Sequence, residues 1–318
     1  MNDFERYVLQ EHVADFDDGV ISRRELLRRV TLITGSLAAT LVLLEAIGCG
    51  EQPRGVAATP VSRATNRAAP FATPPAAPTT TGVTVRPDDP RIRVQALAVE
   101  GADGARLITY SARPAGQTAG GILVVHENRG LVEHIKDVVR RVATAGFTGL
   151  AVDLLSRDGG ADRLSDPAAY AAALARRPVA DMVSDLQRGL QALSATGPAA
   201  RLGITGFCFG GGMVWNALAA GAAVKAAVPF YGPAPQDVAA LAATKAAVFA
   251  VYAQLDSRIT GTSGQIEAQL KQTGRPYRIT VYPGVDHAFH NDTGPRYNAV
   301  QAEAAWVAAV EWFRQYVI

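Results

Sequence analysis

Short apolar runs alternate with segments of helical spacing from Gly121 to the end of the chain, and this alternation limits the possible folds most strongly. Continuous apolar runs are typical of strands buried on both faces, and parallel strands need long crossover connections, most often helices. The order predicts an α/β fold with a mainly parallel central sheet and helices on both faces. The predicted strands span residues 121–125, 147–154, 201–206, 224–231, 246–252 and 277–282, and the predicted helices span 132–145, 179–193, 210–220 and 297–317.

A predicted hairpin marks the start of this domain. Residues 94–99 and 105–110 flank the turn Gly101-Ala102-Asp103-Gly104, whose glycines and aspartate are typical of hairpin turns. We therefore place the α/β domain at residues 90–318.

Charge and cysteine content exclude two classes of protein. Lys and Arg number 31 against 29 Asp and Glu, so the net charge of +2 gives no basic surface for a nucleic acid, and we expect no nucleic-acid partner. The only two cysteines are Cys49 and Cys208, which excludes a disulfide framework and a multi-cysteine metal site.

Residues 1–50 have the order of an export leader. A basic segment that contains Arg23 and Arg24 precedes the apolar run Val30–Leu44, and small residues follow it. Arg23-Arg24 followed by Glu-Leu-Leu resembles the twin-arginine signal for export of folded proteins. Glu45 ends the run before it reaches the roughly 20 residues of a spanning helix. The alternative is a basic amphipathic surface helix.

Two further features bear on localisation. Ala46-Ile47-Gly48-Cys49 resembles a bacterial lipoprotein box, in which the thiol is acylated, although Ala46 stands where Leu is usual. Lipidation of Cys49 would tether the chain to a membrane; otherwise Cys49 leaves with the leader, or the uncleaved segment is the anchor. Residues 51–89 are rich in Pro, Ala and Thr and predict a disordered linker. We expect a tethered periplasmic or cell-surface protein, and recovery of the unprocessed chain from the soluble cytoplasm would contradict this.

Cys208 lies in Gly206-Phe207-Cys208-Phe209-Gly210, between a predicted strand and a predicted helix. This context is typical of a nucleophile elbow, the strained turn that holds the nucleophile of an α/β-hydrolase above the sheet. The N-terminus of the following helix favours a thiolate. Cys208 is therefore the candidate nucleophile, against the alternative of a small buried hydrophobic residue.

The partners of Cys208 are sought at other strand ends. His287 follows the last predicted strand and suits the nucleophile, acid, His order of this fold, so it is the candidate base. Asp256 follows the strand 246–252 and is the candidate orienting acid. Asp286 and Asp237 are the competitors: Asp286 is adjacent to His287 in a loop, and Asp237 lies on a less defined segment.

Glu127 directly follows the strand 121–125, within His126-Glu127-Asn128-Arg129-Gly130. A carboxylate at the ligand-facing end of a central strand loses hydration unless it has a partner or a task. The same loop is expected to provide one oxyanion-hole N–H, from Asn128, and Phe209 the other. The alternative for Glu127 is a solvated loop charge.

These segments together resemble the dienelactone hydrolase family, the carboxymethylenebutenolidases of α/β-hydrolase fold. The resemblance covers residues 90–318 and rests on the segment 126–130, the segment 206–211, Asp256 and His287-Ala288-Phe289. It implies a Cys-Asp-His triad that opens a lactone through an acyl-enzyme, with a Glu that holds the resting thiol until substrate frees it. Carried over, these roles fall on Cys208, Asp256, His287 and Glu127.

The resemblance also implies arginines that clamp a substrate carboxylate. Arg157 occupies a matching place after its strand, but no Arg follows His287, where His290 and Asn291 stand instead. Loss of one bidentate contact would weaken selection for acidic lactones. The expected substrate is therefore a small-molecule ester or lactone rather than a particular dienelactone.

Three alternatives stay open. A thiol redox protein would use Cys208, although no C-x-x-C is present. A tethered binding module would keep the fold without the chemistry. A metal site could use Glu127, His287 and His290 by ligand type alone. We expect no cofactor, no metal and a monomer.

Overall fold

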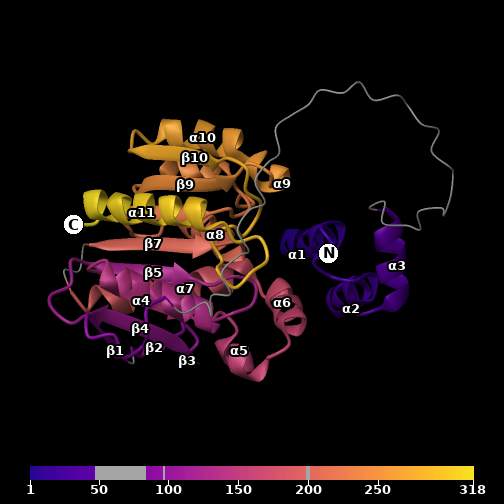
Figure 1. The fold of residues 1–318 in the computed structure, drawn as a ribbon, viewed down its shortest axis with the longest axis horizontal. Helices are drawn as coiled ribbons and strands as arrows, with labels where there is room; N and C mark the ends of the chain where they lie inside the picture. Colours follow the sequence, from indigo (N-terminus) through magenta and orange to yellow (C-terminus); the bar gives the residue numbers. More distant parts are fainter. Residues whose placement is uncertain (47–83, 96, 198–200) are drawn as a thin grey trace, which may run out of the picture.

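The computed structural model describes residues 1–46, 84–95, 97–197 and 201–318 (Figure 1). Its centre is an eight-stranded sheet in the order β1-β4-β6-β5-β7-β8-β9-β10. The first two pairings are antiparallel, and all pairings from β6 to β10 are parallel. The strands are β1 (Ile92–Gln95), β4 (Thr109–Pro114), β5 (Gly121–Val125), β6 (Thr148–Val152), β7 (Leu202–Phe207), β8 (Ala226–Phe230), β9 (Ala247–Ala253) and β10 (Tyr277–Tyr282).

The predicted mainly parallel sheet is confirmed, because each of its six predicted strands is present with ends shifted by a few residues. Every residue of β5 to β9 is buried, which explains why these strands read as continuous apolar runs. The predicted hairpin is shorter than expected. It consists of β2 (Val99–Glu100) and β3 (Arg106–Leu107), while its outer residues join β1 and β4 of the main sheet.

The four predicted helices are present and pack against the sheet: α4 (Glu133–Thr144), α7 (Val179–Ser194), α8 (Phe209–Ala219) and α11 (Ala299–Tyr316). Several short elements were not predicted: η1 (Ser156–Asp158), α5 (Gly160–Arg163), α6 (Pro167–Arg176), η2 (Ala239–Ala243), α9 (Ser257–Thr260) and α10 (Ser263–Gln272). Asp166 caps α6 and Pro167 begins it, but the alanine-rich sequence of α6 lacks clear helical spacing of larger apolar residues.

Three helices form the N-terminal segment: α1 (Asp3–Asp17), α2 (Arg23–Thr34) and α3 (Leu37–Ala46). The apolar run Val30–Leu44 is divided between α2 and α3, because Gly35 ends α2 in a left-handed conformation with φ 73°. No single helix among the described residues has the length and hydropathy of a membrane span; α2 and α3 pass that test only as a pair bent by 112°.

The N-terminal helices lie against the catalytic domain. α1 contacts α2 and α6, and α2 buries Leu26, Val30 and Ile33 on one face. In Figure 1 the indigo helices stand at the end of the sheet to which the arrowhead of β7 points. Cys49 and most of the predicted linker lie outside the described residues. Export, lipidation and the leader therefore stay predictions.

Candidate active site

Cys208 occupies a sharp turn between β7 and α8. Its φ of 57° and ψ of −122° are unusual for a residue with a side chain, and its N–H donates to the Phe230 carbonyl at 3.1 Å. The flanking glycines allow the turn. A Cβ on Gly206 would lie 2.3 Å from the Gly210 carbonyl oxygen, and a Cβ on Gly210 would lie 2.3 Å from the Val125 carbonyl oxygen. The G-x-C-x-G spacing is thus a requirement of local packing.

His287 and Asp256 meet at the same end of the sheet. Asp256 follows β9, His287 follows β10, and β9 and β10 are parallel neighbours. The Asp256 Oδ2 lies 2.6 Å from His287 Nδ1, and both side chains are buried. A ring nitrogen of His287 and the Cys208 Sγ lie within 4.8 Å of each other. The structure therefore brings together the three predicted triad residues.

The charges around His287 favour its protonated form. Burial alone would lower the pKa of His287, but the negative charge of Cys208 and the hydrogen bond to Asp256 act against it and raise the pKa to about 10. At neutral pH the ring is therefore an imidazolium beside the sulfur. Such a ring can stabilise a thiolate and can later donate a proton to a leaving group.

Glu127 is also at the site, with a different partner from the one expected. Its Oε2 accepts from the Asn291 amide at 2.6 Å, while its buried Oε1 has no hydrogen-bond partner among the described residues. Burial, with Glu127 and Cys208 nearby, raises the pKa of the Tyr231 phenol well above its usual value. The predicted hold of Glu127 on the thiol stays a prediction.

The two predicted oxyanion-hole residues occupy suitable positions in the chain. Phe209 begins α8, so its N–H has no acceptor within the helix. Asn128 lies in the loop that follows β5, the central strand beside β7. The role of both N–H groups stays a prediction.

Arg157 is bound away from these residues. Its guanidinium forms hydrogen bonds with Asp103 in the β2–β3 turn and with Asp185 on α7, at distances from 2.6 to 3.1 Å. The structure does not bring Arg157 together with Cys208 or His287. The turn η1 directs this side chain toward the hairpin, although its place after β6 matches the family's pattern.

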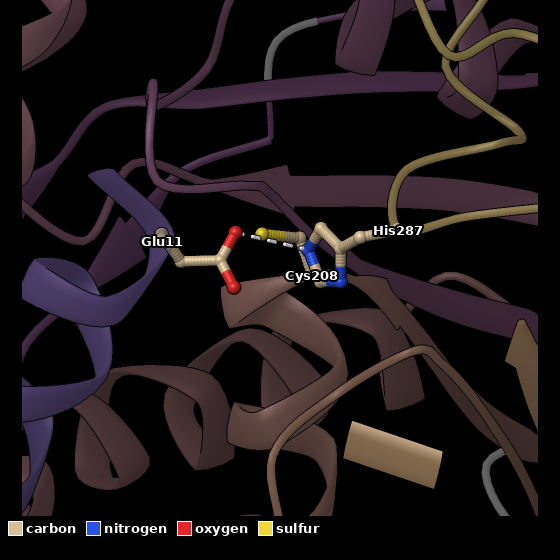
Figure 2. A group of neighbouring side chains, drawn as sticks. All are labelled: Glu11, Cys208 and His287. Carbon is tan, nitrogen blue, oxygen red and sulfur yellow. Dashed lines mark ion pairs between the residues drawn. The ribbon is translucent and has the colours of Figure 1, made fainter. Parts of the chain in front are cut away.

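Helix α1 contributes side chains that the sequence did not suggest. Figure 2 shows Glu11 on α1, pointing toward Cys208 and His287. The Glu11 Oε2 lies 3.3 Å from His287 Nε2, and its Oε1 pairs with the Arg258 guanidinium. Tyr7, one turn earlier, has its hydroxyl 3.2 Å from Cys208 Sγ. Burial and the interaction with Cys208 hold the pKa of Tyr7 well above its usual value, so the phenol keeps its proton, and either group can be the donor in this contact.

A metal site is poorly supported. Glu11, Cys208 and His287 are the one set of possible metal ligands that cluster within the described residues. The Arg258 guanidinium already pairs with Glu11, and this positive charge disfavours a cation there. The alternative set of Glu127, His287 and His290 does not form such a cluster; the His290 ring stacks on Phe207 with centroids 4.9 Å apart.

The sequence held weak signals for the missed residues. Tyr231 is the last residue of a predicted strand, whereas the triad residues follow theirs, and Arg258 lies two positions after Asp256. Asn291 stands where the family's second arginine was sought. Tyr7 and Glu11 share a helix face because they are four residues apart, but nothing local relates that face to Cys208, about 200 positions away.

The sheet, the elbow and the paired acid and histidine define an α/β-hydrolase. Residues 107–317 match the model of the dienelactone hydrolase family, about two thirds of the chain. The chain belongs to this family and is a hydrolase.

Relatives of known sequence and structure agree with this assignment. A Methylorubrum extorquens protein that bears the name carboxymethylenebutenolidase is 38% identical over 221 residues, which cover 65% of this chain and 76% of the relative. An Escherichia coli O157:H7 protein of the same name is 33% identical and covers 76% and 94%, respectively. A crystal structure named as a dienelactone hydrolase from Klebsiella pneumoniae has a TM-score of 0.64 and 30% identity, and covers 71% of this chain and 99% of its own.

Proposed function

We propose that the chain hydrolyses a carboxylic ester or lactone through an acyl-enzyme on Cys208. The observation that carries this proposal is the elbow itself, where Cys208 stands at φ 57° beside a histidine whose other ring nitrogen is 2.6 Å from Asp256. A strained nucleophile, a base and an orienting acid are the parts that acyl transfer needs.

The proposed reaction has two stages. The Cys208 thiolate attacks the carbonyl carbon, and the Phe209 and Asn128 N–H groups stabilise the resulting oxyanion. The intermediate collapses, His287 donates its proton to the departing alkoxide, and a thioester remains on Cys208. His287 then takes a proton from water, whose oxygen attacks the thioester, and the acid product leaves as the thiolate is regenerated.

Arg258 supports a substrate that carries a carboxylate. Its guanidinium already binds the carboxylate of Glu11, which lies 3.3 Å from His287 Nε2. Arg157 is held by Asp103 and Asp185, so Arg258 is the better placed of the two to bind an acidic group beside the triad. Charge-assisted hydrogen bonds to a guanidinium are among the strongest polar contacts in proteins.

Arg258→Gln should therefore reduce the preference for acidic esters. We expect the ratio of kcat/KM for p-nitrophenyl hemisuccinate to that for p-nitrophenyl butyrate to fall by roughly tenfold or more, because only the first substrate loses a charged contact. Arg275→Gln, at an exposed arginine, is the matched control. The ratio of the two kcat/KM values isolates recognition of the carboxylate. Release of Glu11 from its pair with Arg258 would change kcat/KM for both esters by the same factor and would leave the ratio unchanged. An unchanged ratio would remove Arg258 from substrate recognition.

Glu127 is proposed to restrain the thiolate at rest. Its carboxylate is buried just beyond the end of β5, the strand that pairs with β7 and so with the strand that leads to Cys208, and one of its oxygens has no partner among the described residues. A negative charge beside the sulfur disfavours the thiolate. Glu127→Gln should therefore shift the pH profile of Cys208 alkylation by iodoacetamide toward lower pH. Glu100→Gln in the exposed hairpin is the control, and coincident profiles for Glu127→Gln and wild type would rule out this restraint.

A further inference from the structure

We infer that helix α1 is an internal inhibitor that occupies the catalytic pocket and must move away before substrate reaches Cys208. This inference rests on the proposed role of Cys208 as the nucleophile. It concerns a segment that the family match leaves out, since that match begins at residue 107.

One face of α1 fits the site. Phe4, Tyr7 and Glu11 recur at helical spacing, so their side chains point in the same direction. The Phe4 ring packs against Phe209, with centroids 4.7 Å apart, directly beside the nucleophile. Tyr7 then covers the sulfur and Glu11 covers the histidine. The helix thus contacts three successive parts of the catalytic centre.

The contacts occupy the atoms that chemistry would need. The Tyr7 hydroxyl lies 3.2 Å from the sulfur that would have to reach a carbonyl carbon, and the Glu11 carboxylate lies 3.3 Å from Nε2 of His287, the ring nitrogen that would donate to the leaving group. Glu11 is itself 8% exposed and is held by Arg258, whose guanidinium also lies 5.1 Å from the Tyr7 ring centroid. A carboxylate placed in this way imitates an acidic substrate.

The pocket is closed while α1 is in place. Cys208 is 5% exposed and His287 is 7% exposed. A cavity of about 340 Å³ runs beside α1 and is lined by Glu11, Arg258 and His287, but Cys208 is not part of its lining. A substrate in this cavity would meet the histidine without reaching the sulfur. Displacement of α1 joins the cavity to the nucleophile.

Polar contacts at both ends of α1 hold it there. Arg296, in the loop before α11, donates to Asp15 at 3.0 Å and to Asp18 at 2.6 Å. At the other end, the Asn2 amide donates to the Ala175 carbonyl of α6 at 3.2 Å. These contacts are partly exposed and individually weak, so they suit a segment that can dissociate. Cleavage of the predicted leader near Cys49 would remove α1 together with α2 and α3.

The test compares variants of the full-length chain that weaken α1 at different points. Glu11→Gln removes the negative charge that pairs with Arg258 and His287, and Phe4→Ala removes the ring that packs on Phe209. Glu45→Gln, the same substitution at an exposed position on α3, is the control. The readouts are the rate of iodoacetamide labelling of Cys208, followed by mass spectrometry of its peptide, and kcat/KM for p-nitrophenyl acetate. Thermal unfolding confirms that each variant is folded.

In both test variants, labelling of Cys208 and hydrolysis of the ester should be roughly tenfold faster or more. Loss of a buried charge pair or of a packed aromatic ring should shift the equilibrium between docked and displaced α1 by at least that factor. Glu45→Gln should match wild type. Phe4 is uncharged, so faster labelling in Glu11→Gln alone would indicate an electrostatic effect on the thiol and would overturn the inference. Unchanged labelling in both, or slower hydrolysis in both, would also overturn it. Faster labelling with unchanged hydrolysis would support closure by α1 but contradict the proposed role of Cys208.

Discussion

Cys208→Ala should lower kcat for a simple aryl ester by roughly a millionfold, to the residual rate that binding and oxyanion stabilisation alone can give. The loss follows from the position of the sulfur, which stands at the elbow beside His287. Steady-state hydrolysis of p-nitrophenyl acetate, with burst-free progress curves, measures this effect.

The control is the same substitution at the other cysteine. Cys49 lies before the catalytic domain, so Cys49→Ala in the purified chain should keep full activity. Circular dichroism and thermal unfolding should show Cys208→Ala folded, because Ala fills the place of a small buried side chain. Hydrolysis at the wild-type rate by Cys208→Ala would refute the proposed mechanism.

Asp256→Asn should reduce kcat by roughly ten thousandfold, since an amide can no longer hold the productive tautomer of His287 or stabilise its positive charge. The carboxylate lies 2.6 Å from Nδ1 and helps to raise the pKa of His287 to about 10. The fall should therefore be accompanied by a lower pKa for His287, which NMR titration of the ring can follow.

The competing acid provides the comparison. Asp286 accepts from the backbone N–H of His287 at 2.7 Å, and no hydrogen bond joins its carboxylate to the ring in the described structure. Asp286→Asn should thus change kcat by less than roughly tenfold. The opposite ranking of the two variants would transfer the orienting role to Asp286.

The fold and the triad could be predicted from the sequence because both depend on local patterns. β5 to β9 are buried on both faces and read as apolar runs, while Cys208, Asp256 and His287 follow the ends of β7, β9 and β10 by one, three and five residues. The carboxyl ends of parallel strands share one edge of the sheet, so residues far apart in sequence were expected to meet there. The glycines on either side of Cys208 also predict the sharp turn.

Other features depend on the directions of side chains, which the spacing of residues along the sequence does not determine. Arg157 has the expected place after β6, yet two carboxylates in other elements bind it. Glu127 lies at the expected strand end, and its partner proved to be Asn291. The packing of α1 on the catalytic centre joins segments about 200 residues apart. The order of residues 1–50 predicts an export leader and contains no signal for that contact.

Trapping of the acyl-enzyme tests the central proposal most directly. The chain is mixed with a slowly hydrolysed aryl ester, quenched in acid within seconds, and its intact mass and the peptide that contains Cys208 are measured. The proposed mechanism predicts one acyl group per chain, attached to Cys208, which disappears as product forms and is absent in Cys208→Ala. Rapid turnover without any acylated Cys208, or an acyl group that accumulates on another residue, would contradict it.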